Sequence, residues 1–244
     1  MKKKSKFWSL LLMTVLALIF ASSCSKSNDS SNPTPSGTVT DIDGNVYHAV
    51  TIGTQVWMVE NLKVTKYNDG TAIPSVTDFS AWSNLTTGAY CNYGNTKINA
   101  TNYGRLYNFY AVNTGKLAPK GWHVPSYDEW SILAAFLGGE SIAGGKLKAT
   151  GSSWASPNTG ATNETGFSGL PGGDRSGGGG FGSDGGHYSV GQFGIWWSST
   201  GVSNGGAAWF CNLSYDDSGL FIDNYEYGYG NNWRFGKSVR CIKD

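Results

Sequence analysis

The sequence has little charge and almost no excess of either sign. Charged residues make up 14% of its 244 positions, against about a quarter in typical globular domains. The first 23 residues hold four lysines and no acid; without them the chain carries 14 basic and 17 acidic side chains, a net charge of −3. Such a chain lacks the basic surface that nucleic-acid binding requires, so we expect no nucleic-acid partner.

The composition also differs from that of a disordered chain. Aromatic residues make up 14% of the chain, with ten tryptophans, whereas disordered chains have few aromatics and a high net charge. After removal of the N-terminal segments described next, about 205 residues remain, which is enough for one hydrophobic core.

No apolar run is long enough to cross a membrane. The longest, Phe7 to Phe20, falls short of a spanning helix and is typical of a signal-peptide core. It follows a basic start and ends in Ala21-Ser22-Ser23-Cys24, which resembles the bacterial lipobox. We therefore predict a lipoprotein signal peptide over residues 1–23 and lipidation of Cys24. The alternative is an ordinary signal peptide with a cysteine nearby by chance.

A polar segment follows the lipobox. Residues 24–37 are mainly Ser, Asn, Pro and Gly, which bury too little apolar surface to order themselves. We predict a flexible tether here and one globular domain over residues 38–244. Acyl chains on Cys24 would anchor the protein to the outer membrane. Whether it faces the periplasm or the cell surface is left open.

The first part of the domain is rich in strand signals. Val39 to Lys66 contains a hairpin turn signal at Asp43–Asn45. Gln55 to Leu62 is apolar on both faces, which indicates a buried strand. Asp69 to Asn102 is rich in turn residues and carries aromatics; loops of this length are uncommon unless functional. Arg105 to Val112 fits either a helix or a strand.

One helix is predicted in detail. Ser126 is a good N-cap, and Glu129 completes a capping box. The apolar residues that follow have helical spacing: Trp130, Leu133, Ala134 and Leu137. Gly138-Gly139 provides a stop, and a weaker helix is predicted over Ser141 to Ala149.

The last third alternates between glycine-rich and strand-like segments. Gly166 to Gly194 holds thirteen glycines in twenty-nine positions, but aromatic residues punctuate it, so we predict ordered irregular loops. The strands predicted after it cover residues 195–198, 208–215, 220–225 and 238–243.

Several segments, in order, resemble one family. They are GTQVWMVENL, GRLYNFYAV, LAPKGWHVPSYDEW, GFSGLPGGDRS, WWSST and the terminal SVRCIKD. The set resembles the Fibrobacter succinogenes major paralogous domain family, abundant in lipoproteins of Bacteroidetes and Fibrobacteres. The resemblance covers about Val39 to Asp244. It implies an exported or lipidated protein and no particular activity.

A weaker similarity links the capped helix, the glycine-rich middle and the final strand to the sulfatase-modifying-factor domain. That domain is a variant of the C-type-lectin-like fold, so the resemblance implies an α+β domain with a twisted antiparallel sheet, two helices and long loops. Formylglycine-generating enzymes bind copper with two cysteines near the C-terminus. Here only Cys241 lies in that region, and Cys211 is thirty residues earlier, so the oxidase activity is not carried over.

The remaining cysteines, histidines and acids give no clear catalytic or metal motif. Cys211 and Cys241 could pair as a disulfide; the alternative is three buried free thiols, with Cys91 as the third. Asp41, Asp43 and Asn45 mimic the start of a calcium loop, but a hairpin turn is favoured. We predict no cofactor; calcium has no specific motif. Of the histidines, His48, His123 and His187, the second is expected to hydrogen-bond within the fold.

Aromatic residues in the C-terminal third are candidates for ligand binding, because exposed rings stack on sugars and polar neighbours bind hydroxyl groups. The alternative is that these rings fill the core. The predicted binding residues are Trp196, Trp197, Tyr227, Tyr229, Trp233, Asp223 and Asn231.

These observations favour a non-enzymatic binding or adhesion module that is anchored to the envelope and binds a glycan or a protein. One alternative is an enzyme of unknown chemistry on the sulfatase-modifying-factor scaffold, which would require His123, Arg175 and Cys241 to converge in one cleft. The other is a purely structural envelope protein. The oligomeric state is left open.

Overall fold

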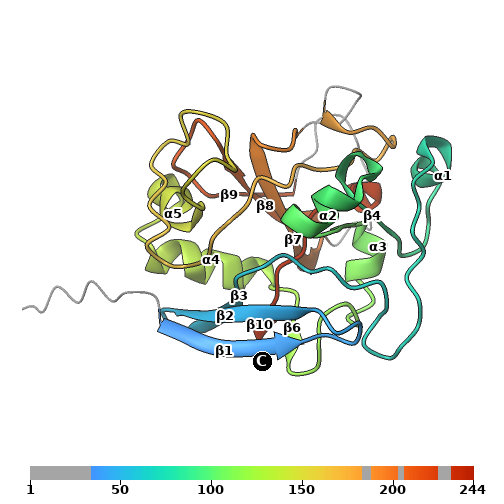
Figure 1. Cartoon of the computed structure of the whole chain (residues 1–244), viewed down its shortest axis with the longest axis horizontal. Helices are drawn as coiled ribbons and strands as arrows, with labels where there is room; N and C mark the ends of the chain where they lie inside the picture. Colours follow the sequence, from blue (N-terminus) through green and yellow to red (C-terminus); the bar gives the residue numbers. More distant parts are fainter. Residues whose placement is uncertain (1–33, 183–187, 203–205, 225–231) are drawn as a thin grey trace, which may run out of the picture. The chain divides into compact units, whose positions relative to one another are not determined.

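A computed structural model describes residues 34–182, 188–202, 206–224 and 232–244 (Figure 1). These residues form a mixed α+β structure of antiparallel sheets and several short helices. The predicted signal peptide and Cys24 lie outside the described residues. None of the described helices has the length and apolar character of a membrane span.

The largest sheet has five strands in the order β1-β2-β3-β10-β6, and each neighbouring pair is antiparallel (Figure 1). The predicted hairpin is present, and its first strand begins within the last residues of the predicted tether. In sequence order the strands are β1 Thr34–Thr40, β2 Val46–Ile52, β3 Gln55–Met58, β6 Trp122–His123 and β10 Ile242–Lys243.

Only residues 242–243 of the predicted strand over 238–243 form a ladder. The residues before them still run alongside β3 and the segment after it, because the N–H groups of Met58 and Leu62 donate to the carbonyls of Cys241 and Val239. The strand prediction is therefore too long at its start.

A second sheet has three antiparallel strands, β7 Phe193–Gly201, β8 Ala208–Ser214 and β9 Phe221–Asp223. Two hydrophobic clusters cover its two faces. The Tyr107 cluster includes Tyr107, Phe109, Trp197, Phe210 and Cys241. The Trp57 cluster includes Trp57, Trp130, Phe167, Trp196 and Cys211.

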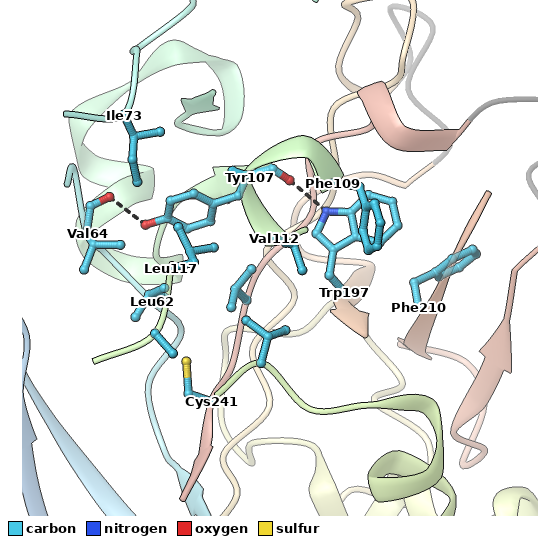
Figure 2. Close-up of a cluster of buried hydrophobic side chains, with 14 of the residues drawn as sticks. Leu62, Val64, Ile73, Tyr107, Phe109, Val112, Leu117, Trp197, Phe210 and Cys241 are labelled. Carbon is cyan, nitrogen blue, oxygen red and sulfur yellow. Dashed lines mark hydrogen bonds between the residues drawn. The ribbon is translucent and has the colours of Figure 1, made fainter. Parts of the chain in front are cut away.

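The Tyr107 cluster combines apolar packing with polar links (Figure 2). The Tyr107 hydroxyl donates to the carbonyl of Val64 at 2.8 Å, and the Trp197 indole N–H donates to the carbonyl of Tyr107 at 2.8 Å. Buried tyrosine and tryptophan side chains usually need such partners. Here those bonds tie the cluster to the backbone.

Short helices connect the sheets. The helix predicted in detail is α4, Tyr127–Phe136, and its capping box is present. The weaker predicted helix is α5, Glu140–Leu147. The segment 105–112 contains both a strand and a helix, because β5 is followed directly by α3. The other elements are α1 Phe79–Ser83, β4 Tyr90–Cys91, η1 Tyr93–Asn95, α2 Lys97–Tyr103, β5 Leu106–Tyr107, α3 Phe109–Val112 and η3 Asn232–Arg234.

Two glycines let α5 lie directly on neighbouring backbone. A Cβ atom at Gly144 would come within 1.9 Å of the carbonyl oxygen of Gly219, and one at Gly145 within 2.4 Å of that of Gly160. The Gly145 N–H donates to the carbonyl of Ser218. This close approach, and not helix propensity, explains two adjacent glycines inside a helix.

The glycine-rich loops are ordered where the structure describes them, and buried cationic side chains bond to carbonyl groups in these loops and in the segments around them. Lys148 Nζ donates to the carbonyls of Thr159, Ser214 and Asp217 at 2.7–2.8 Å. Arg240 donates to the carbonyl of Phe167. These bonds take the place of a regular ladder.

Candidate functional site

Two of the aromatic residues predicted to bind a ligand in the C-terminal third are fully buried. Trp196 and Trp197 both have 0% exposed surface. Neighbouring strand residues point to opposite faces of a sheet, and here a hydrophobic cluster covers each face. The prediction of one outward ring is therefore wrong.

The structure describes two of the other predicted binding residues. Trp233 is half-buried against Phe109, with ring centroids 5.1 Å apart, so its ring is largely used in packing. Asp223 is exposed at the end of β9. The remaining three lie outside the described residues: Tyr227, Tyr229 and Asn231.

The three cysteines that the structure describes form no disulfide and are poorly suited to act as nucleophiles. Cys91, Cys211 and Cys241 are all free and buried, which corrects the pairing considered between the last two. Those two side chains belong to different hydrophobic clusters. Burial raises the pKa of Cys91 to about 12 and also raises the pKa values of the other two thiols. Thiols that stay protonated are poor nucleophiles.

The three groups that the enzyme alternative required have separate environments. His123 Nε2 lies 2.8 Å from Glu129 Oε1, and its Nδ1 lies 2.7 Å from Asp244 Oδ1. His123 thus hydrogen-bonds within the fold, as predicted. Arg175 is buried between the rings of Trp82 and Phe181. The Cys241 thiol packs in the Tyr107 cluster.

The acidic turn between β1 and β2 is a hydrogen-bonded hairpin. Asp41 Oδ1 accepts the N–H groups of Asp43 and Asn45, each at 2.9 Å. Asp43 Oδ2 accepts both the N–H and the hydroxyl of Thr65. Within the part of the chain that the structure describes, no group of three or more His, Cys, Asp or Glu side chains could hold a metal ion.

The candidate site is a pocket of about 580 Å³ beside α2. Segments far apart in the sequence build it, from the β1–β2 turn to the residues just before β5. Ser75 and Tyr90 meet in a bridge on one wall. The lining residues are Asn45, Lys63, Ser75, Tyr90, Asn92, Lys97, Ala100, Thr101 and Arg105.

The pocket is polar and cationic. Three of its lining residues are basic, and none is acidic. Arg105 is held in place: its Nε donates to the carbonyl of Lys63 at 2.8 Å, its Nη1 donates to Asn92 Oδ1 at 2.9 Å, and its guanidinium carbon lies 4.6 Å from the centre of the Tyr90 ring.

Sequence reasoning did not single out this pocket. Its basic residues stand at positions 63, 97 and 105, with no local spacing that marks them as a set. The one available signal was the long loop over residues 69–102, whose length suggested a function. Six lining residues lie in that loop: Ser75, Tyr90, Asn92, Lys97, Ala100 and Thr101.

A comparison with protein families identifies the chain's relatives. The sequence profile of the Fibrobacter succinogenes major domain matches residues 50–243. The chain belongs to this family. No curated protein and no solved structure gives a significant match.

In this member of the Fibrobacter succinogenes major domain family, the ordered motifs converge in the core. Five of the six motif segments contribute to the Trp57 cluster or contact it directly. Trp57 lies 4.7 Å from Trp130 and 5.8 Å from Phe167, measured between ring centroids. Phe167 lies 6.0 Å from Trp196, and the Arg240 guanidinium carbon lies 4.1 Å from the centre of the Phe167 ring. Five of the motifs therefore encode packing, whereas the sixth, GRLYNFYAV, includes Arg105 of the pocket.

Proposed function

We propose that this protein is a lipid-anchored, non-enzymatic binding module of the bacterial cell envelope, and that the pocket beside α2 binds a saccharide. The observation that carries this proposal is the chemistry of the pocket. Its lining offers amide, hydroxyl and cationic groups around one tyrosine ring, with no carboxylate, histidine or cysteine. Such groups bind sugar hydroxyls, and the pocket lacks the histidine and carboxylates that most often serve in general acid–base catalysis.

The fold we propose is a variant of the C-type-lectin-like fold. The antiparallel sheets, the pair formed by α4 and α5, and the long ordered loops agree with that architecture. A likeness of fold alone is a weak argument for function, so the proposal depends on the pocket.

A glycan array tests saccharide binding directly. The probe is residues 25–244, which omit the signal peptide and the lipidated cysteine. We expect binding to at least one saccharide class, and we expect Ala100→Trp to abolish it, because the new ring would occupy the pocket. The matched control is Ala135→Trp, at an exposed position on α4. An array without a reproducible ligand would contradict the proposal.

The anchor is tested separately. Cys24→Ala should move the protein from the membrane fraction to the soluble fraction, because the acyl chains would have no attachment site. If the variant stays in the detergent phase of a partition assay, the lipobox interpretation is wrong.

A further inference from the structure

We infer that the ligand of this pocket is an acidic saccharide, recognised through a carboxylate or sulfate group. The inference rests on the proposed function, because it names the chemical class of the ligand in the same pocket. It comes from the distribution of charge around the pocket.

Positive charge is concentrated in the pocket although the chain is net negative. Lys63, Lys97 and Arg105 all line it, and no acidic residue does. The predicted mature chain carries 14 basic and 17 acidic side chains. A concave cluster of charges of one sign attracts ligands of the opposite sign. The pocket therefore attracts anions although the whole chain carries a net negative charge.

The two lysines of the pocket, like the exposed Lys120 and Lys243, have no carboxylate partner among the described residues, whereas three other lysines do. These three, Lys66, Lys116 and Lys146, each form an ion pair with a carboxylate, at 2.9–3.3 Å. Lys63 and Lys97 form no such pair with any residue that the structure describes. Their positive charge is therefore left for a ligand.

The two acids close in sequence to Asn45 of the pocket wall are already engaged. Asn45 Nδ2 donates to Asp41 Oδ2 at 2.8 Å, so the amide of the wall covers that carboxylate. Asp43 pairs with Lys66 and accepts two bonds from Thr65. Neither carboxylate lines the pocket, and neither neutralises its lysines.

Arg105 provides a fixed cation in the same pocket as the two lysines. Its bonds to a carbonyl and an amide oxygen, and its position over the Tyr90 ring, fix the guanidinium without using a carboxylate. A fixed guanidinium loses little side-chain freedom on binding and suits the planar geometry of carboxylates. The neighbouring hydroxyl and amide groups of Ser75, Asn92 and Thr101 would bind the sugar hydroxyls.

Titration calorimetry with matched polysaccharides tests the inference on residues 25–244. Polygalacturonate supplies carboxylates, and its fully methyl-esterified form is the neutral match. A sulfated galactan supplies sulfate esters, and its desulfated form is the neutral match. In one of the two pairs, we expect the acidic polymer to bind at least about tenfold more tightly than its neutral match. Added salt should weaken the binding of that acidic polymer. The pair that responds distinguishes carboxylate from sulfate.

Charge variants locate the binding. Lys63→Gln with Lys97→Gln should weaken binding of the acidic polymer by about tenfold or more, whereas Lys120→Gln, at an exposed lysine outside the pocket, should leave it unchanged. Ala100→Glu should also abolish this binding, while Ala100→Gln, of nearly equal size, should retain most of it. This second pair keeps the test valid if the double lysine variant folds poorly.

The outcomes separate the two proposals. Equal binding of acidic and neutral polymers, with no effect of the lysine variants, overturns the acidic ligand but leaves saccharide binding intact. An equal loss with Lys120→Gln also overturns it, because binding would then depend on general charge. Absence of binding to every saccharide overturns the proposed function itself.

Discussion

The five-stranded sheet and the glycine-rich loops of residues 148–182 keep their carbonyl groups hydrogen-bonded in different ways. In the sheet, strands from β1 to β3 bond to one another in register. In the loops, bonds come largely from single backbone contacts and from buried cationic side chains. Buried carbonyl groups need partners in either case, so a chain without ladders must provide donors from its side chains.

The cations of the loops are long and fully buried. Arg175 is 1% exposed, and Arg240 and Lys148 are each 0% exposed. Burial lowers the pKa of Arg240 to about 9, so it stays charged at neutral pH. A charged donor makes stronger hydrogen bonds than a neutral one, and one guanidinium can join several loops. The comparison shows that a few buried cationic side chains can hold a large irregular region together through hydrogen bonds to its carbonyl groups.

The strongest test of this comparison is Arg175→Met. Arg175 donates to four carbonyls, those of Gly179, Val76, Thr77 and Asp78. Methionine preserves apolar contact with the flanking rings but leaves those carbonyls without the donor. Each buried unsatisfied group costs about 1–3 kcal/mol, so we expect a loss of at least about 5 kcal/mol in the free energy of unfolding.

Denaturant titration measures this loss, with Lys120→Met as the control at an exposed position. A midpoint for Arg175→Met equal to that of the unchanged protein would show that the loops do not depend on this side chain.

The next test addresses the regular part of the fold. Trp130→Ala should cost about 3–5 kcal/mol, because a fully buried ring in the Trp57 cluster is lost. Trp130→Phe should cost much less, since Trp130 Nε1 is buried without a hydrogen-bond partner. If the phenylalanine variant is as unstable as the alanine variant, the indole nitrogen has a role that packing does not explain.

A smaller effect is expected at the start of α4. Ser126→Ala should cost about 1 kcal/mol, because Ser126 Oγ would no longer accept the N–H of Glu129. Thermal or denaturant unfolding measures it beside Trp130→Ala. If Ser126→Ala costs more than Trp130→Ala, the N-cap contributes more to the stability of this helix than the buried ring does.

The helix and the hairpin could be predicted because their signals are local. The capping box at Ser126 and Glu129 lies within one helical turn, and the turn at Asp43–Asn45 joins adjacent strands. The burial of Trp197 could not be predicted, because it depends on a second layer that covers the other face of β7. The pocket was missed for the same reason, since only the folded chain brings Lys63 and Lys97 together.

The smallest expected effect is a pH dependence at His123. Burial opposes protonation, but the bonds to Asp244 and Glu129 outweigh it and raise the pKa above 6.5. The stabilisation is therefore complete below the unfolded-state pKa and is lost as the pH rises through the folded-state value. The difference in stability from His123→Gln should be larger at about pH 6 than at about pH 8.5. Denaturant titrations at both pH values measure it; a difference that grows with pH would contradict this assignment.

The position of β10 has a consequence for the order in which the five-stranded sheet forms. β10 lies between β3 and β6, and Ile242 pairs with both Trp57 and His123. Its neighbour β3 is made near the start of the domain, so their pairing must wait until almost the whole domain has been synthesised. Pairing across such a separation is slow. Until it occurs, β3 and β6 present unpaired edges that can join other chains. When residues 242–243 pair with β3 and β6, they cover these two edges and so prevent edge-to-edge aggregation.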